Sequence, residues 1–193
     1  MTEKLILTDC DGVLLDWTSM FYEYMETHGF TIKPGPKYSY ILDSHFEAIT
    51  YDEVKIHIRQ FNESAAIGFL QPFRDSIYYV KRLYEEHGYR FRVITSLSSN
   101  VYAAKLREHN LRQYFGDAIE SVSCLECGAD KDEALKEFQH SQLFWIEDKA
   151  QNADVGHQLG LSSILMIHDH NKDHKCSYPK VNIWKEIYER ITK

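Results

Sequence analysis

Five short apolar runs, separated by longer segments of helical periodicity, constrain the fold of this chain more than any other feature. The runs cover residues 5–9, 91–96, 118–123, 143–148 and 163–168. Nearly continuous apolar runs of this length are typical of strands buried on both faces of a parallel sheet. Helical patterns occupy residues 76–87, 100–110, 131–139, 152–159 and 181–192. The alternation predicts an α/β fold, a doubly wound parallel sheet of about five strands with helices on both faces.

A long interval after the first run breaks this alternation. Residues 16–74 contain helical patterns at 18–28 and 51–61 but no run of the central-strand type. An ordinary connection between a strand and the next helix is far shorter. We therefore predict a small helical cap domain of residues 16–74, inserted into an α/β core domain of residues 1–15 and 75–193. Asp16 is expected to cap the first helix of this insertion, because aspartate is favoured at that position.

Polar and charged side chains stand where four of the runs end or just beyond them. They form an acidic pair, two hydroxyls, an ammonium and a second acidic pair: Asp9 and Asp11, Thr95 and Ser96, Lys131, and Glu147 and Asp148. The carboxyl ends of parallel strands share one edge of the sheet, where such folds bind their ligands. This set is what metal-assisted attack on a phosphate monoester requires, because a carboxylate and a phosphate dianion repel each other unless a divalent cation lies between them.

The acidic residues suit the bond-breaking steps of that reaction. Asp9 is ionised at neutral pH and needs no base to attack phosphorus. Asp11 is placed to donate a proton to the leaving oxygen and then to accept one from water. Mg²⁺ prefers oxygen ligands, so Asp9 and Asp148 are candidate metal ligands, and Glu147 is a candidate to orient a metal-bound water.

The phosphoryl oxygens need a cation and hydroxyl donors. Lys131 and Thr95 are expected to supply them, with Ser96 assisting. Lys136 is a second candidate for the role of Lys131. Gly12 allows a sharp turn whose backbone amides can face the phosphate. The expected partner is a small phosphorylated metabolite.

Composition excludes other classes of function. The net charge of −7 argues against a binder of nucleic-acid polymers, which neutralises phosphates with Lys and Arg. No run approaches the roughly 18 apolar residues that span a bilayer, and the N-terminus lacks signal-peptide features, so a cytoplasmic protein without a membrane partner is expected. Several cysteines and histidines fit no standard zinc spacing, and we interpret them as ordinary thiols and solvated imidazoles: Cys124, Cys127, Cys176, His168, His170 and His174.

Taken together, four motifs in this order resemble those of the haloacid dehalogenase superfamily of phosphohydrolases. They are D-x-D-G-V at residues 9–13, the hydroxyl of Thr95 in VITS, Lys131 in GADKDEAL, and the acidic pair 147–148 in FWIEDKAQN. The resemblance implies that Asp9 forms an aspartyl phosphate and that Asp11 is the general acid and base. It also implies that Asp9, Asp148 and the backbone carbonyl of Asp11 bind Mg²⁺. The dehalogenases of the superfamily lack the second aspartate, so phosphate chemistry is favoured.

The sequence departs from the family pattern at two positions. Asp132 follows the motif lysine where many members have proline, and Asn152 stands where one branch has aspartate. The sequence leaves open which of Glu147 and Asp148 contacts the metal directly.

A narrower resemblance concerns the substrate. D-G-V-L-L-D-W is similar to the first motif of the 5'(3')-deoxyribonucleotidases, in which the aromatic residue belongs to the nucleobase pocket. This implies a nucleoside monophosphate as substrate, with Trp17, Phe21 and Tyr40 as candidate specificity residues. The alternatives are that these aromatic side chains only pack the cap, that the substrate is a sugar phosphate or another small phosphomonoester, and that the protein binds a phosphorylated ligand without turnover.

Overall fold

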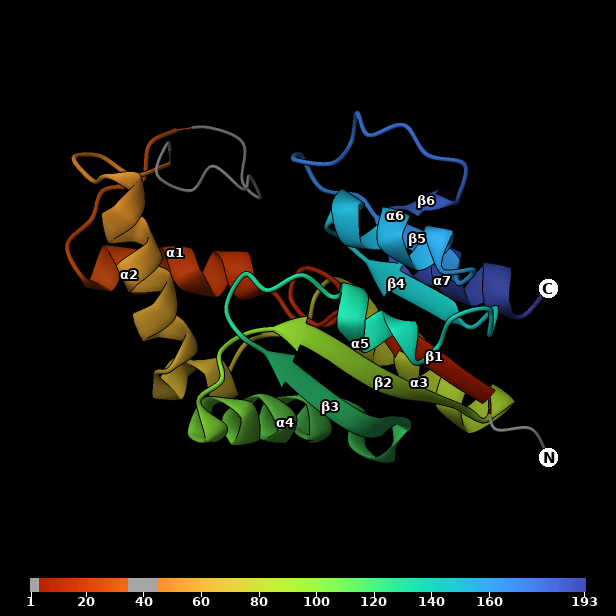
Figure 1. Cartoon of the computed structure of the whole chain (residues 1–193). Coiled ribbons are helices and arrows are strands. Elements are labelled where there is room, and N and C mark those ends of the chain that lie inside the picture. Colours follow the sequence, from red (N-terminus) through yellow and green to blue (C-terminus); the bar gives the residue numbers. More distant parts are fainter. Residues whose placement is uncertain (1–3, 35–44) are drawn as a thin grey trace.

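The computed structural model describes residues 4–34 and 45–193, and a six-stranded parallel sheet forms its centre (Figure 1). The strands are β1 (Lys4–Thr8), β2 (Tyr89–Ser96), β3 (Ile119–Leu125), β4 (Phe144–Glu147), β5 (Ser162–Met166) and β6 (Lys180–Val181). Their order is β3-β2-β1-β4-β5-β6, and every neighbouring pair is parallel. The predicted fold class is confirmed. Sequence analysis misses β6, because a strand of two residues is too short to show an apolar pattern.

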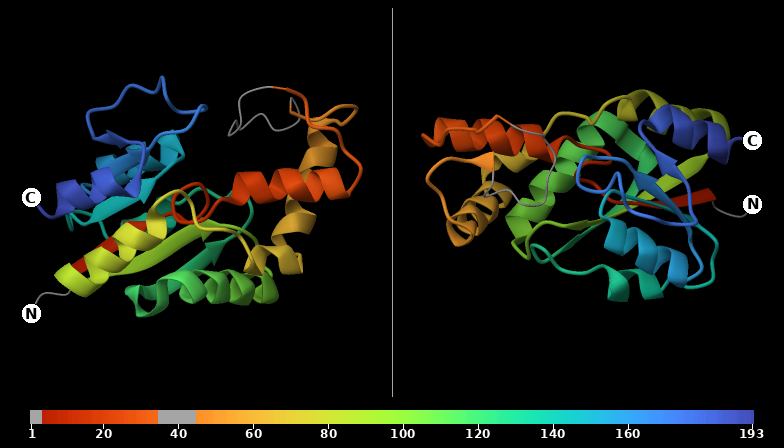
Figure 2. Two further views of the ribbon diagram at one scale, coloured as in Figure 1. Left: turned by 180° about the vertical axis from the view of Figure 1, so that it is seen from behind. Right: turned by 90° about the horizontal axis from the view of Figure 1, so that it is seen from above.

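Helices cover both faces of the sheet (Figure 2). On one face α3 (Ser76–His87) packs against α4 (Val101–Phe115) and α7 (Trp184–Ile191). On the other face α5 (Asp132–Lys136) packs against α6 (Ala150–Gln158). The short 3₁₀ helix η3 (Gly116–Ala118) precedes β3 and contacts α3 and α4. Gly88 caps the C-terminus of helix α3, and its φ of +73° is a conformation that favours glycine.

Successive side chains of β1 supply two different cores. Ile6 belongs to the larger core, which includes buried residues of α3, α4 and α7. Leu7 belongs to the smaller core, where it joins Trp145 and Leu135. Both β1 side chains are fully buried, as expected for a strand covered on its two faces.

The described part of the interval between β1 and α3 contributes no strand to the sheet. It contains α1 (Trp17–Thr27), α2 (Tyr51–Asn62) and the 3₁₀ helix η2 (Ala65–Gly68). Helices α1 and α2 lie beyond the carboxyl ends of the strands (Figure 1). The Asp16 side chain accepts a hydrogen bond from the Ser19 backbone at 3.1 Å, which confirms it as the N-cap of α1.

Two linkers connect this helical segment to the sheet, and they run side by side. The backbone N–H of Asp16 donates to the Gln71 carbonyl at 2.8 Å. The N–H of Phe73 donates to the Leu14 carbonyl, also at 2.8 Å. The chain therefore leaves and re-enters the core at adjacent points.

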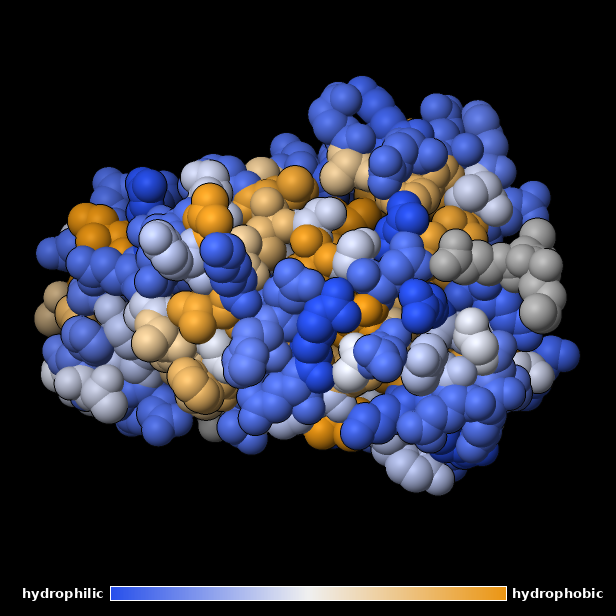
Figure 3. All heavy atoms as spheres, turned by 90° about the horizontal axis from the view of Figure 1, so that it is seen from below, coloured by the Kyte–Doolittle hydropathy of each residue, from blue (hydrophilic) through white to orange (hydrophobic). Residues whose placement is uncertain are grey.

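One face of the molecule can be followed in a space-filling view (Figure 3). On the face seen from below in Figure 3, hydrophilic residues predominate and hydrophobic ones form small scattered patches. Within residues 4–34 and 45–193, no helix has the length and apolarity needed to cross a bilayer.

Candidate active site

The end of β1 positions Asp9 in the middle of the sheet edge. Its backbone N–H donates to the Ile146 carbonyl of β4 at 2.8 Å, which continues the pairing of the two strands beyond β1. Because β1 and β4 are neighbours, Asp9 lies beside the acidic pair that ends β4. Carboxylate oxygens of Asp9, Glu147 and Asp148 lie within 4.8 Å of one another. The sequence prediction that these side chains meet is confirmed.

Lys131 lies between two of these carboxylates. It immediately precedes α5, and its side chain is 2% exposed. Its Nζ atom lies 2.7 Å from Asp9 Oδ1 and 2.8 Å from Glu147 Oε2. Burial alone would lower the pKa of Lys131, but the two carboxylates outweigh it and raise the pKa. The ammonium therefore stays charged between the two carboxylates.

The Glu147 carboxylate is fully buried and accepts four hydrogen bonds. Oε1 accepts from the backbone N–H groups of Asp148 and Lys149, both at 3.0 Å. Oε2 accepts from Lys131 at 2.8 Å and from Asn152 Nδ2 at 3.2 Å. Asparagine at position 152, where the sequence departs from one family branch, thus supports Glu147.

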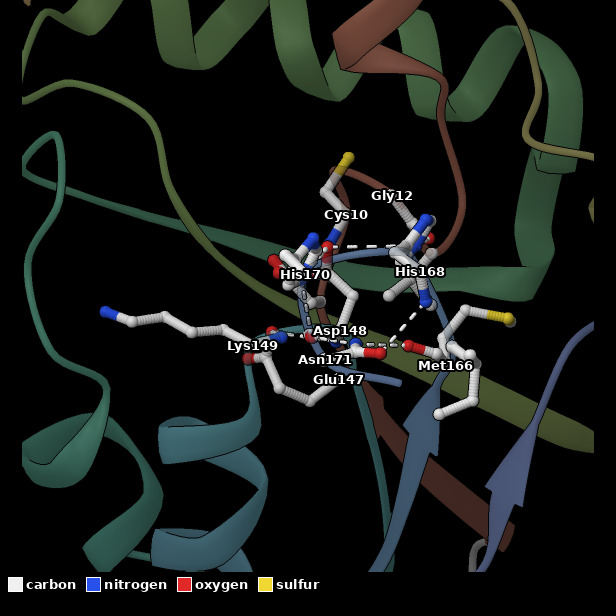
Figure 4. Close-up of polar contacts among 12 residues, drawn as sticks. Cys10, Gly12, Glu147, Asp148, Lys149, Met166, His168, His170 and Asn171 are labelled. Atoms are coloured by element: carbon white, nitrogen blue, oxygen red, sulfur yellow. Dashed lines mark hydrogen bonds and ion pairs between the residues drawn. The ribbon is translucent and has the colours of Figure 1, made fainter. Parts of the chain in front are cut away.

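A loop that follows β5 holds Asp148 from the other side (Figure 4). Asn171 Nδ2 donates to the Asp148 carbonyl at 2.6 Å and to the Met166 carbonyl at 2.8 Å. The Nε2 atom of His170 lies 3.2 Å from the same Asp148 carbonyl. His168 Nε2 donates to the Gly12 carbonyl at 2.8 Å, which links this loop to the turn after β1.

The interpretation of His168 and His170 as solvated imidazoles is wrong. The His168 residue is 4% exposed, and the His170 side chain is 8% exposed. Burial lowers the pKa of His168 to about 4, so its ring is neutral at pH 7. The available signal in the sequence was their position, at the last residue of the fifth apolar run and two residues beyond it, at the same sheet edge.

Asp11 pairs with a residue that sequence analysis missed entirely. Arg107 of α4 donates from Nη1 to Asp11 Oδ1 and from Nη2 to Oδ2, the latter at 3.1 Å. The Arg107 side chain is fully buried. Burial raises the pKa of Asp11, and the guanidinium opposes that rise. Arg107 lies on the buried side of its helix together with Ala103 and Leu111, and a cation in that apolar stripe was the available signal.

When all four carboxylates are ionised, the charged groups at this edge carry an excess of two negative charges. The four carboxylates are those of Asp9, Asp11, Glu147 and Asp148, and the two cations are Lys131 and Arg107. Lys149 extends away from the cluster and pairs with Asp130 at 3.7 Å. Burial and nearby carboxylates raise the pKa of Asp9 to about 7 and that of Asp148 to about 8. Oxygen donors with this charge excess fit one hard divalent cation such as Mg²⁺.

The two hydroxyls at the end of β2 differ in their contacts. Thr95 Oγ1 is buried, and it has no hydrogen-bond partner within the described part of the chain. Ser96 Oγ donates to the Ala129 carbonyl at 2.7 Å. A buried hydroxyl without a partner is costly, and a bound ligand would satisfy it.

These groups face a cavity of about 670 Å³ at the carboxyl edge of the sheet. Its floor includes the predicted catalytic, phosphate-binding and metal-binding residues Asp9, Asp11, Thr95, Ser96, Lys131 and Asp148. The opposite wall comes from the helical segment and includes Trp17, Tyr51 and Ile58. A volume of this size is typical of small-molecule sites.

The aromatic specificity candidates fall in three different places. Trp17 lines the cavity, and its Nε1 donates to Asn62 Oδ1 at 2.8 Å. Phe21 is fully buried inside the helical segment, where its ring stacks on Trp17 at 4.7 Å, so the structure does not bring it to the cavity. Tyr40 lies outside the described residues.

Comparison with other sequences identifies one viral relative. No family model matches this sequence. The chain is 28% identical over 158 residues to an uncharacterized 32.4 kDa protein of Enterobacteria phage T4, encoded between Gp30 and rIII. The match covers 77% of this chain and 55% of the phage protein, so the chain spans about half the length of that relative.

Comparison with solved structures shows the fold. A haloacid dehalogenase-like hydrolase from Streptococcus pneumoniae is 14% identical and has a TM-score of 0.64, with 99% of this chain and 100% of that chain covered. A covalently loaded L-2-haloacid dehalogenase from Xanthobacter autotrophicus is 10% identical, with a TM-score of 0.62 and 98% of each chain covered. A D,D-heptose 1,7-bisphosphate phosphatase from Burkholderia thailandensis is 12% identical, with a TM-score of 0.57 and coverage of 98% and 99%. This chain therefore has the fold of the haloacid dehalogenase-like hydrolases.

Proposed function

We propose that this protein is a Mg²⁺-dependent phosphomonoester hydrolase that acts through an aspartyl phosphate on Asp9. The observation that carries the proposal is the excess of two negative charges on oxygen donors at the floor of the cavity. A divalent cation would balance this excess, and the Thr95 hydroxyl and Lys131 supply the donors that a phosphoryl group needs. In this proposal residues 16–74 form a cap domain over the site, and the remaining residues form the core domain.

The metal-binding residues in this proposal are Asp9, Asp148 and the backbone carbonyl of Asp11. Bound Mg²⁺ would neutralise phosphoryl charge so that a carboxylate can approach phosphorus. Glu147 is assigned a supporting role, because its two oxygens already accept four hydrogen bonds. It holds Lys131 and the backbone of Asp148 in place.

The reaction has two steps, in which Asp9 and Asp11 act in turn. An Asp9 oxygen attacks phosphorus, the bond from phosphorus to the ester oxygen breaks, and Asp11 gives a proton to the leaving alcohol. Asp11 then takes a proton from a water molecule while the oxygen of that water attacks phosphorus. The bond from Asp9 to phosphorus breaks and inorganic phosphate is released. Thr95 and Lys131 bind the phosphoryl oxygens throughout.

Phosphate transfer fits the site better than dehalogenation. A halide leaves without accepting a proton, so dehalogenation would not need Asp11 as a proton donor. It would also leave the excess negative charge of Asp9, Glu147 and Asp148 without a partner. These two features favour a phosphate ester as substrate.

For the substrate class we propose a nucleoside monophosphate, and Trp17 supports this choice. Its indole lies in the cavity wall beyond the phosphate-binding floor, where a base could stack on it. Trp17→Ala should then raise KM at least 10-fold for a nucleotide, while KM for a small phosphate changes little. Tyr102→Ala is the matched control, because Tyr102 is 75% exposed and does not line this cavity. An equal effect of Trp17→Ala on both substrates would favour a sugar phosphate or another small phosphomonoester.

The decisive experiment measures phosphate release by the purified full chain. An aryl phosphate, nucleoside monophosphates and sugar phosphates are tested with Mg²⁺ and with a chelator. We expect turnover only with the metal, and Asp9→Asn should abolish it while the far-UV circular dichroism stays unchanged. Asp117→Asn, an exposed aspartate in η3, should leave turnover unchanged. Activity retained by Asp9→Asn would refute the mechanism, and a wild-type protein that hydrolyses no phosphate ester would refute the function.

A further inference from the structure

Arg107 is a buried cation that the proposed reaction does not yet use. Its side chain is fully buried, and it does not belong to the cavity lining. Its Nη1 and Nη2 atoms contact the two oxygens of Asp11, and Nη1 also donates to Cys10 Sγ at 2.9 Å. A buried guanidinium is unfavourable unless it is well paired, and within the described residues both of its pairing groups belong to the turn between β1 and Gly12.

Helix α4 holds the Arg107 side chain in a fixed place. Asn110, one turn further on, donates to the Leu70 carbonyl at 3.1 Å. Leu106 packs against Gly68, where an added Cβ would lie 3.1 Å from Leu106 Cδ2. These contacts fix the helix on both sides of Arg107, so the guanidinium presents its two nitrogen atoms to Asp11 from a rigid element.

We infer that Arg107 is the positioning residue for the proton-transferring carboxylate of Asp11. This inference rests on the proposed function and adds to it a residue from outside the four family motifs. A two-pronged guanidinium fixes both the plane and the direction of a carboxylate, which a single hydrogen bond does not. One lone pair on each oxygen remains for the proton exchanged with the leaving alcohol and with water. Asp11 therefore faces the cavity with one side and Arg107 with the other.

A double-mutant cycle on turnover tests whether Arg107 acts through Asp11. Arg107→Met removes the charge and keeps a flexible side chain of similar length. It should lower kcat about 100-fold in the wild-type background, the scale of general acid–base catalysis. In the Asp11→Asn background the same change should lower kcat less than about 3-fold. KM for a small phosphate should stay within about 3-fold, because Thr95 and Lys131 still bind it.

Two further variants separate positioning from folding. Arg112→Met changes another arginine of α4, which pairs with Glu108 at 2.8 Å away from the cavity, and it should leave kcat unchanged. If Arg107→Met fails to fold, Arg107→Ala supplemented with guanidinium ion replaces it, and saturable recovery of kcat is expected only when Asp11 is present.

The possible outcomes have different meanings. If Arg107→Met lowers kcat by the same factor with and without Asp11, or if guanidinium restores turnover in the absence of Asp11, the positioning role is refuted while the phosphatase stands. If the wild-type protein releases no phosphate from any ester, the proposed function fails, and the role of Arg107 fails with it.

Discussion

Gly12 allows a sharp test of how tightly the candidate metal-binding edge is built. Its φ is +73°, and a Cβ placed on it would lie 2.6 Å from Asp148 Oδ2 and 3.2 Å from His168 Nε2. Gly88 has the same φ of +73°, but no atom lies within 4 Å of a Cβ there. Alanine at either position therefore carries the same backbone strain, and only at position 12 does it also meet the candidate metal ligand.

The expected magnitudes follow from this pair. An L-residue in the left-handed region costs about 1–2 kcal/mol, so both variants should lose at least this much free energy of unfolding. The contact with Asp148 should add to the loss in Gly12→Ala alone. Asp148 Oδ2 must move by about 0.8 Å to reach ordinary contact with the new methyl group. A displacement on this scale should lower kcat/KM roughly 10- to 100-fold in Gly12→Ala alone. The affinity for Mg²⁺ should fall by a similar factor.

Three measurements on the two variants separate the effect of the contact with Asp148 from that of backbone strain. Chemical denaturation gives the stability cost, calorimetric titration gives the Mg²⁺ affinity, and phosphate release gives turnover. The reasoning is refuted if Gly12→Ala binds Mg²⁺ and turns over like Gly88→Ala. It is also refuted if Gly88→Ala loses activity, because backbone strain alone would then account for the effect.

Two other predictions concern the buried charges. Lys131→Met should abolish phosphate release and lower the free energy of unfolding by about 3–5 kcal/mol, because two buried carboxylates lose their cation. Lys136→Met, whose parent side chain is 55% exposed, is the control in the same denaturation and turnover assays, and an equal loss there would contradict the assignment. In the metal-free protein the raised pKa values of Asp9, about 7, and Asp148, about 8, mean that the folded state holds more protons than the unfolded state. Stability in a chelator should therefore fall as pH rises from 5 to 8.5, and Mg²⁺ should restore more stability at pH 8.5 than at pH 6. A rise in chelator would contradict this sign.

The sequence predicts the sheet and most of the site, because both depend on local pattern. Apolar runs mark the strands, and polar residues at their ends mark the edge where Asp9, Lys131 and Asp148 meet. Local pattern does not predict Arg107, because its partner Asp11 is 96 residues away and only the packing of α4 brings the two together. The hydrogen bonds of Asn171 are not predicted either, because Asn171 lies in an irregular loop whose sequence has no periodicity.

The narrower predictions also depend on tertiary packing. Phe21 and Trp17 share one helix, and sequence treats them alike, yet Phe21 is enclosed by other aromatic rings while Trp17 reaches the cavity. Helical periodicity shows which side of α1 is apolar. It does not show how much of that side the neighbouring helix α2 covers.

The two adjacent linkers determine how the segment between them can be replaced in evolution. Because the N–H of Asp16 donates to the carbonyl of Gln71, the two ends of the intervening segment are already in direct contact. The segment can lengthen, shorten or be exchanged for an unrelated one while the distance between its ends stays the same. The sheet edge with the candidate catalytic residues then keeps its geometry while the opposite wall of the cavity is replaced. Under the proposed function, such a replacement would change the substrate and leave the residues that carry the reaction in place.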